Sequence, residues 1–424
     1  MLPLLVMQPI GGKAAAMSSS GTDACGARSG KVSGEAGAGG PVVELPLHLT
    51  EKILYSISPL ASVRLATVCK SWAAAISERI ARPVPHLFVY LPPDNKSDRR
   101  GVVVSVSVPM DYGGPPAVVI PNRVRLADTN GLRCVGAMPS GWLAFANWCW
   151  CDTGVQLVNP ITGARWRLDV DRLRRDPVIA AAGGAADSFI CIGTDELVLW
   201  WRAGGGEEWS KRTVAAAAHR TDGIVSVVNC NGRFYILDRD GQVSLIDATA
   251  PPPVVIEKLP VACLLEQFPT LATTATSHML ESDGEVLFVR RVLASTMEHR
   301  GIPFCHHNIT EHLSIVGFEV YRLDVEGQCW TEVKKLAGDR ALFVSPLSSF
   351  SVRSSETEGC RSNCIYFVDK KRYCSSCIRD DGNTWGVYSM DDRVVLFEYV
   401  VTGAGPCSSP TWFLPSAALG SELF

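Results

Sequence analysis

The sequence predicts an N-terminal all-α segment of short helices followed by an all-β domain, best explained as a six- or seven-bladed β-propeller. Three observations lead to this fold class. The 424 residues include 37 Gly, 26 Pro and 11 Trp, and such a supply of turn formers is typical of many short strands. Apolar residues follow a helical period only in residues 43–83. From residue 84 onward, strand patterns joined by Asn-Gly and Asp-Gly turns recur at roughly 40 to 50 residues, the period of propeller blades.

Residues 1–42 form a leader rich in Gly, Ser and Ala, and no aromatic residue occurs before Tyr55. Such a segment cannot bury enough apolar surface to offset its ordering entropy, so we predict that it is disordered. The first ten residues are apolar but lack the basic region and cleavage site of a signal peptide. No stretch is long and apolar enough to predict a transmembrane helix.

Charge and cysteine content narrow the class of protein. The 40 Lys and Arg against 43 Asp and Glu give a formal net charge of −3, which provides no strong field for nucleic acid or an acidic membrane. The 15 Cys are odd in number and scattered through predicted strands. Free buried thiols are typical of a reducing compartment, so we expect the protein in the cytoplasm, the nucleus or both.

The helical segment 43–83 has more apolar positions than one narrow stripe needs, and prolines at 59 and 83 interrupt and end it. A unit of about 40 residues is rarely stable by itself. We therefore expect part of its apolar surface to be covered, either by the rest of the chain or by another protein.

The order of residues in this segment resembles an F-box. The matching elements are Leu45-Pro46-x-x-Leu49, Ile53-Leu54, Pro59-Leu60, Arg64 and Val68-Cys69-Lys70-Ser71-Trp72. Ile57-Ser58-Pro59 departs from the family pattern by shifting a proline one position. The resemblance implies binding to a Skp1-like adaptor, and through it to a cullin–RING ubiquitin ligase. The adaptor-binding residues it implies are Leu45, Pro46, Leu49, Ile53, Leu54, Leu60, Val68, Cys69, Lys70 and Trp72. The alternative is a helical hairpin that packs on its own domain.

Strands are predicted along the whole of residues 84–424. The clearest are 88–91, 102–108, 141–147, 155–168, 196–201, 225–248, 278–292 and 318–336, with a last group after residue 348. We expect insertions near 91–100, 170–185 and 294–313. A pair of β-sandwiches is the alternative architecture.

Several motifs in this domain resemble the plant F-box proteins that carry the domain of unknown function 295, regarded as a β-propeller. The motifs are Asn159-Pro160-x-Thr162-Gly163, Asn229-x-x-Gly232-Arg233-Phe234-Tyr235, Gly338-Asp339-Arg340-Ala341-Leu342-Phe343, Ser349-Phe350-Ser351-Val352, Cys364-Ile365-Tyr366-Phe367 and Trp412-Phe413. The resemblance implies a receptor for a protein substrate or partner, and it leaves the target unidentified.

Motifs for catalysis are missing: the sequence has no G-x-S-x-G, no H-E-x-x-H and no Walker A loop. We therefore expect no catalytic residue, no enzymatic activity and no cofactor. Two clusters leave a metal open as an alternative. Cys360, Cys364, Cys374 and Cys377 have a spacing that could close a zinc site, and His299, Cys305, His306, His307 and His312 lie in a predicted loop.

Two tryptophans, Trp148 and Trp201, belong to Trp-rich strand ends and are our candidates for the target-binding surface, because Trp is enriched at binding hot spots. The leading hypothesis is a substrate-receptor subunit of an SCF (Skp1–cullin–F-box) ubiquitin ligase. A second is a non-ligase protein whose propeller sequesters a partner, and a third is a propeller enzyme with a metal in its channel.

Overall fold

The structure is a computed structural model of the whole chain. It describes residues 46, 49, 52–53, 72, 85–90, 100–105, 120–125, 132–138, 141–147, 154–160, 163–169, 173–181, 188–193, 196–201, 210–215, 224–247, 256–267, 277–298, 310–357, 359–370, 383–401 and 410–414. Within these ranges, no helix is both long and apolar enough to cross a membrane.

The described strands form six sheets, which we number I to VI along the chain. Sheet I contains β1 (His86–Tyr90), β2 (Arg100–Ser105), β3 (Ile120–Arg125) and β25 (Thr411–Phe413). Sheet II contains β4 (Leu132–Ala137), β5 (Leu143–Asn147), β6 (Gly154–Val158) and β7 (Arg165–Asp169). Sheet III contains β8 (Leu173–Ala181), β9 (Ser188–Gly193), β10 (Glu196–Trp201) and β11 (Ser210–Ala215).

The other three sheets come from the second half of the chain. Sheet IV contains β12 (Ile224–Cys230), β13 (Arg233–Asp238), β14 (Val243–Asp247) and β15 (Ile256–Lys258). Sheet V contains β16 (Ser277–Ser282), β17 (Glu285–Glu298), β18 (Thr310–Asp324) and β19 (Cys329–Glu332). Sheet VI has five strands: β20 (Arg340–Ser345), β21 (Ser348–Arg353), β22 (Cys364–Lys370), β23 (Asn383–Ser389) and β24 (Val394–Val401). The short helices α4 (Leu264–Gln267) and η4 (Ser354–Glu356) lie in connections.

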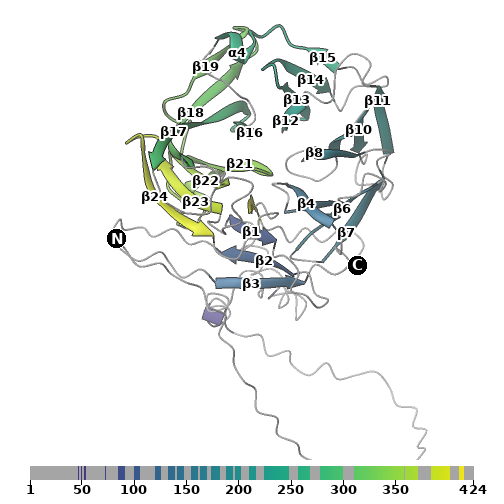
Figure 1. The fold of residues 1–424 in the computed structure, drawn as a ribbon. Coiled ribbons are helices and arrows are strands. Elements are labelled where there is room, and N and C mark those ends of the chain that lie inside the picture. Colours follow the sequence, from purple (N-terminus) through teal and green to yellow (C-terminus); the bar gives the residue numbers. More distant parts are fainter. Residues whose placement is uncertain are drawn as a thin grey trace, which may run out of the picture.

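The sheets follow one another around a central axis, as Figure 1 shows. Each contributes one end strand to an inner ring, in the order β25, β4, β8, β12, β16 and β21, and neighbours in this ring lie close together. This arrangement is a β-propeller and excludes the pair of sandwiches.

The last strand of the chain closes the ring. β25 pairs with β1, so sheet I joins both ends of the domain. The Ser345 hydroxyl of sheet VI lies 2.9 Å from the Thr411 hydroxyl and accepts the Trp412 N–H at 3.1 Å. Closure of this kind removes the exposed ends that an open row of sheets would leave.

Two turns show why the local sequence folds into hairpins. Asn231-Gly232 joins β12 to β13 with φ of 52° and 79°, and Asp283-Gly284 joins β16 to β17 with φ of 57° and 80°. Positive φ at both central residues is the backbone of a type I′ turn, whose twist matches that of the flanking strands. The hairpins predicted at both dipeptides are confirmed.

Two of the predicted insertions contain strands. The residue range 170–185 includes the inner strand β8, and the range 294–313 includes the outer parts of β17 and β18. The β17–β18 ladder continues to the pair Glu298–Thr310, past a β-bulge at Val316. These segments lack the alternation of apolar and polar residues from which a strand is predicted, so the sequence did not indicate them. They are strands because they pair with a neighbouring strand.

Sheets V and VI meet in an aromatic seam. The Phe318 ring lies 5.2 Å from that of Phe367 and 5.4 Å from that of Tyr388, measured between ring centroids. Next to these rings, the Arg291 guanidinium forms an ion pair with the Asp369 carboxylate, and both side chains are nearly nine-tenths buried. The seam therefore combines apolar packing with one buried charge pair that joins β17 to β22.

Candidate partner-binding surfaces

The helical residues near the N-terminus present apolar side chains to solvent. Leu49 and Ile53 are 40% and 37% exposed, and the Leu49 N–H donates to the Pro46 carbonyl at 2.9 Å. Residues four apart on a helix share one face, so these two side chains form a common apolar surface. Trp72 is also helical and is partly buried. The other predicted adaptor-binding residues, Leu45, Leu54, Leu60, Val68, Cys69 and Lys70, lie outside the described residues.

The predicted target-binding tryptophans stay a prediction. Trp148 lies outside the described residues. Trp201 is the last residue of β10, where its backbone is opposite Ser188 and Ser210, but its side chain is outside the description. The structure thus places the backbone of Trp201 and leaves the prediction for both tryptophans untested.

Two of the four cysteines of the alternative zinc site, Cys360 and Cys364, lie in an environment that favours the thiol form. Burial raises the pKa of the Cys360 thiol to about 12, although its hydrogen bond with Tyr366 acts in the opposite direction. Burial also raises the pKa of Cys364 to about 11. Zinc binds the thiolate form, which both shifts disfavour. Cys374 and Cys377 lie outside the described residues, and within the described ranges no three His, Cys, Asp or Glu side chains are placed to hold a metal.

The alternative histidine cluster is not assembled by the described part of the chain. His312 lies in β18 with its side chain undescribed, and the other four members fall outside the described ranges. It stays an untested alternative.

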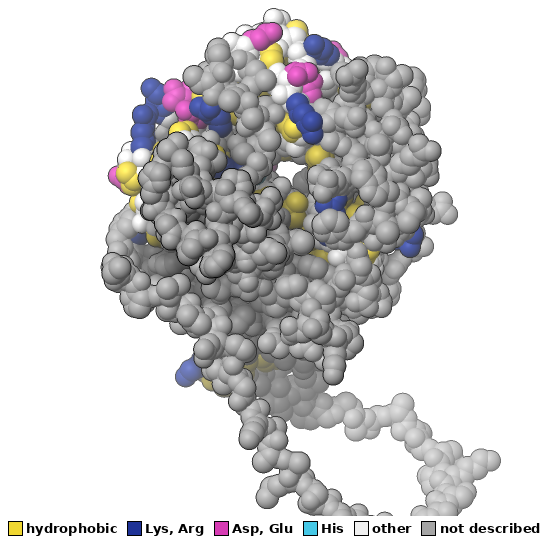
Figure 2. All heavy atoms as spheres, in the orientation of Figure 1, with side chains coloured by type: hydrophobic (Ala, Val, Ile, Leu, Met, Phe, Trp, Pro, Cys, Tyr) yellow, Lys and Arg dark blue, Asp and Glu magenta, His cyan; other side chains and the backbone are white. Residues whose placement is uncertain are grey.

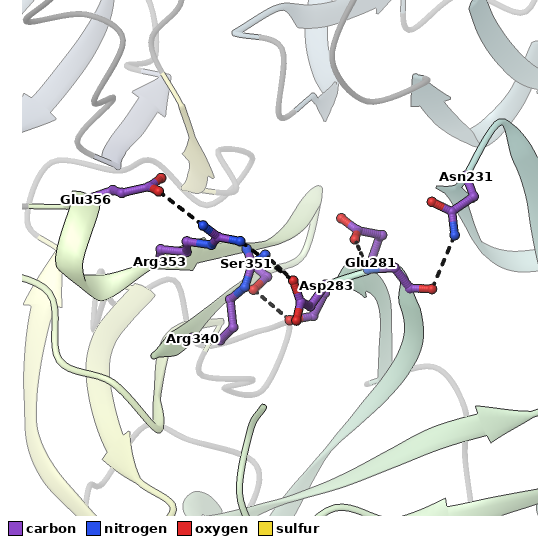
Figure 3. Close-up of polar contacts among 9 residues, drawn as sticks. Asn231, Glu281, Asp283, Arg340, Ser351, Arg353 and Glu356 are labelled. Carbon is purple, nitrogen blue, oxygen red and sulfur yellow. Dashed lines mark hydrogen bonds and ion pairs between the residues drawn. The ribbon is translucent and has the colours of Figure 1, made fainter. Parts of the chain in front are cut away.

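A group of polar residues, five of them charged, gathers where the β16–β17 turn meets sheets IV and VI. We call it the turn network: Asn231, Glu281, Asp283, Arg340, Arg353 and Glu356. Figure 3 shows that these side chains converge from three neighbouring sheets. The Asn231 amide donates to the Gly284 carbonyl at 3.4 Å, and Glu281 accepts the Gly284 N–H at 2.7 Å. The turn is therefore held from its own sheet and from the preceding one.

Sheet VI supplies the cationic side of the turn network. Arg340 donates to the Asp283 carboxylate at 2.9 Å, while Arg353 is 3.9 Å from that carboxylate and 3.5 Å from Glu356. Asp283 is 48% exposed, Arg353 is 51% exposed and Glu356 is 60% exposed. Exposed pairs at such distances add little stability. Half-exposed charges of fixed position are suited to selecting a protein partner by charge complementarity.

Sequence reasoning missed the turn network. Its two signals were present, since Asp283 belongs to an Asp-Gly turn and Arg340 to the Gly-Asp-Arg motif. The residues are 57 positions apart, and only the neighbouring placement of sheets V and VI joins them. Figure 2 shows that described charges of both signs also gather over β17, β18 and β19, where Arg322 pairs with Glu285 at 3.0 Å.

The family comparison agrees with this architecture. The model of the KIB1-4 beta-propeller family matches residues 116–389, which is more than half of the chain. The chain belongs to the KIB1-4 β-propeller family. The predicted resemblance to plant F-box proteins with a β-propeller is thereby confirmed, together with the relatives that follow.

The curated relatives are named as F-box proteins. F-box protein At2g26160 of Arabidopsis thaliana is 27% identical over 190 residues, covering 43% of this chain and 50% of that protein. F-box protein At2g17690 of the same plant is 48% identical over 82 residues, covering 17% of this chain and 19% of that protein. The chain thus spans about half the length of the first relative and about a fifth of the second.

Solved structures share less sequence identity with this chain than these relatives do. TolB from Acinetobacter baumannii aligns with a TM-score of 0.38 at 12% identity, covering 80% of this chain and 70% of that one. The propeller assignment rests on the family match and on the sheet order.

Proposed function

We propose that the chain is the substrate-receptor subunit of an SCF ubiquitin ligase, with a non-catalytic role in the cytoplasm, the nucleus or both. The N-terminal helices bind a Skp1-like adaptor, and a six-bladed propeller binds the protein to be ubiquitinated. The observation that carries this proposal is the exposure of Leu49 and Ile53 on one helical face, in a family whose curated relatives are named F-box proteins.

Adaptor binding would follow from burial of that apolar face. Covering a Leu or Ile side chain that is otherwise exposed contributes roughly 1.5–3 kcal/mol when burial is complete. Leu49 and Ile53 are already partly covered, so each offers a fraction of that amount. The remaining predicted contact residues, from Leu45 to Trp72, would extend the interface along the helices.

The propeller would then present its target at a fixed distance from the ligase. The turn network gives it a charged surface braced by three sheets, which suits selective protein binding. Transfer of ubiquitin would be done by the other ligase subunits, so this chain needs no catalytic side chain of its own.

The test is a co-expression pull-down of the full chain with a plant Skp1-like adaptor. We expect the double variant Leu49→Asp/Ile53→Asp to lose binding, because two buried carboxylates would oppose contact. Lys52→Asp is the matched control, since Lys52 is exposed between the two apolar positions. Equal capture of all three proteins would contradict the proposal.

A second measurement separates a receptor from a sequestering protein. A partner captured by the propeller is incubated with the reconstituted ligase, ubiquitin and ATP. Ubiquitination that requires this chain supports the receptor role. Stable capture without ubiquitination, under conditions where adaptor binding is intact, would favour sequestration.

A further inference from the structure

The connection that follows β21 presents a serine to solvent beside the turn network. It begins with η4, which directly follows β21 and has no buried residue. Its middle residue, Ser355, is exposed and starts the sequence Ser-Glu-Thr-Glu, so Glu356 follows it by one position and Glu358 by three. Acidophilic protein kinases select a serine by the carboxylates that follow it, because their basic substrate groove complements these charges. Ser355 therefore combines an accessible hydroxyl with the charge pattern that such a kinase binds.

Exposure distinguishes Ser355 from other serines of similar sequence. Among the residues whose side chains the structure describes, Ser244, Ser282 and Ser389 also precede an acidic residue by three positions. They are only 6%, 5% and 5% exposed, and each lies in a strand. A kinase must reach the hydroxyl from solvent, so the fold closes these three serines to it and leaves Ser355 open.

Asp339 holds Ser355 in place. The Ser355 N–H donates to the Asp339 carboxylate at 2.9 Å, and the Ser354 N–H donates to the Asp339 carbonyl at 2.8 Å. The Ser355 hydroxyl also donates to the carboxylate, and this hydrogen bond is the main cause that lowers the pKa of Asp339 from its ordinary value. A phosphate in place of the hydroxyl carries a charge of about −1.5 to −2 at pH 7. It would replace this attractive contact with repulsion between two anions.

Arg353 is the cation nearest to hand for such a phosphate. It is 51% exposed, and its guanidinium lies 3.5 Å from Glu356 and 3.9 Å from Asp283, as Figure 3 shows. Both distances are longer than the roughly 2.7–2.9 Å of a strong charge-assisted hydrogen bond, so Arg353 can leave these contacts with little loss. Its charge already acts on Asp339, the residue that contacts Ser355.

We propose that Ser355 is a phosphorylation site for an acidophilic protein kinase, and that its phosphate binds Arg353 in place of the carboxylates of the turn network. In the reaction, the Ser355 oxygen bonds to the γ-phosphorus of ATP, the bond from that phosphorus to ADP breaks, and the hydroxyl proton passes to a base of the kinase. The phosphate repels Asp339 and withdraws Arg353 from Asp283 and Glu356. The consequence for target binding rests on the proposed function: a more negative turn network would favour a more basic target.

The site is tested with the full chain, a purified kinase of the casein kinase II class and ATP, with mass spectrometry to locate the phosphate. We expect phosphate on Ser355, and Ser355→Ala should lose it. Glu358→Gln removes the carboxylate three positions after the serine and should slow phosphorylation of Ser355 about fivefold or more. Ser354→Ala is the matched control and should leave the rate unchanged, because neither the first nor the third residue after Ser354 is acidic. Absence of phosphate on Ser355 while casein is modified in parallel, or equal rates for wild type and Glu358→Gln, would overturn the proposal.

A titration of the phosphorylated chain tests the role of Arg353. Phosphorus NMR follows the pKa of the phosphate, which a neighbouring guanidinium lowers. Arg353→Gln should raise this pKa by about 0.2–0.7 pH units relative to the phosphorylated wild type. Arg322→Gln is the control, since Arg322 pairs with Glu285 instead, and should leave it unchanged. Equal pKa values in wild type and Arg353→Gln would overturn the binding of the phosphate by Arg353. Neither measurement involves the adaptor, so failure of adaptor capture would refute the receptor function and leave this site standing.

Discussion

The seam between sheets V and VI and the helical residues near the N-terminus both align large apolar side chains on one surface, but only the seam is covered by the described chain. Phe367 is fully buried between the two sheets, whereas Leu49 and Ile53 stay more than a third exposed. Burial of apolar area stabilises whichever state covers it. The seam therefore stabilises the propeller fold, whereas the described chain leaves much of the apolar area of Leu49 and Ile53 exposed.

The largest effect is expected at the seam. Phe367→Ala should lower the free energy of unfolding by about 3–5 kcal/mol, because it leaves a cavity beside Phe318. Urea denaturation followed by tryptophan fluorescence measures the change. Val394→Ala, at a site 47% exposed, is the control and should change stability by less than about 0.5 kcal/mol. Equal effects of the two substitutions would contradict the contrast between seam and surface.

The next largest loss of stability is expected when the ion pair of the seam is broken. Arg291→Met should lower the free energy of unfolding by about 3 kcal/mol, because the Asp369 carboxylate stays buried without its partner. The double variant Arg291→Met/Asp369→Leu removes both charges and should recover most of the loss. A double variant as unstable as the single one would show that the pair itself, and not the unpaired carboxylate, decides the outcome.

A substitution where β25 closes the ring should lower the free energy of unfolding by less than the substitutions in the seam. Ser345→Ala removes the partner of Thr411 and of the Trp412 N–H, and should cost about 1–3 kcal/mol. Faster amide exchange at Trp412 would locate the effect in β25. Ser348→Ala provides a matched control. The buried Ser348 hydroxyl has no hydrogen-bond partner among the described residues, so its removal should be neutral or stabilising.

Acidification should weaken the seam through His278. Burial, and next the nearby Arg291 charge, lower the pKa of this imidazole to about 3, below the value of about 6.5 in an unfolded chain. The unfolded state therefore binds more protons between these values, so the contribution is complete above about pH 6.5 and is lost as pH falls towards 3. Between pH 7.5 and 5.5, wild type should lose about 1.4 kcal/mol more than His278→Gln. Parallel pH profiles of the two proteins would exclude this role.

The smallest effect on stability is expected at the helical face. Leu49→Asp with Ile53→Asp should change the free energy of propeller unfolding by less than about 0.5 kcal/mol, because the described chain leaves both side chains exposed. Thermal unfolding monitored by circular dichroism measures this. A large loss of stability would mean that this face packs on its own chain, which was the alternative to adaptor binding.

The turns and the local secondary structure could be predicted from the sequence. Asn231-Gly232 and Asp283-Gly284 dictate their hairpins because these residue types accept positive φ at low cost, and flanking alternation defines the strands. The apolar period of residues 43–83 likewise indicated helices, and residues 49, 52, 53 and 72 are helical.

Long-range pairing was decided only by the tertiary structure. No local pattern indicates that β22 runs parallel to β20, that β25 returns to β1, or that Arg340 reaches Asp283. Such contacts join residues that are far apart in sequence, and their free energy comes from area and charges that exist only after the sheets assemble.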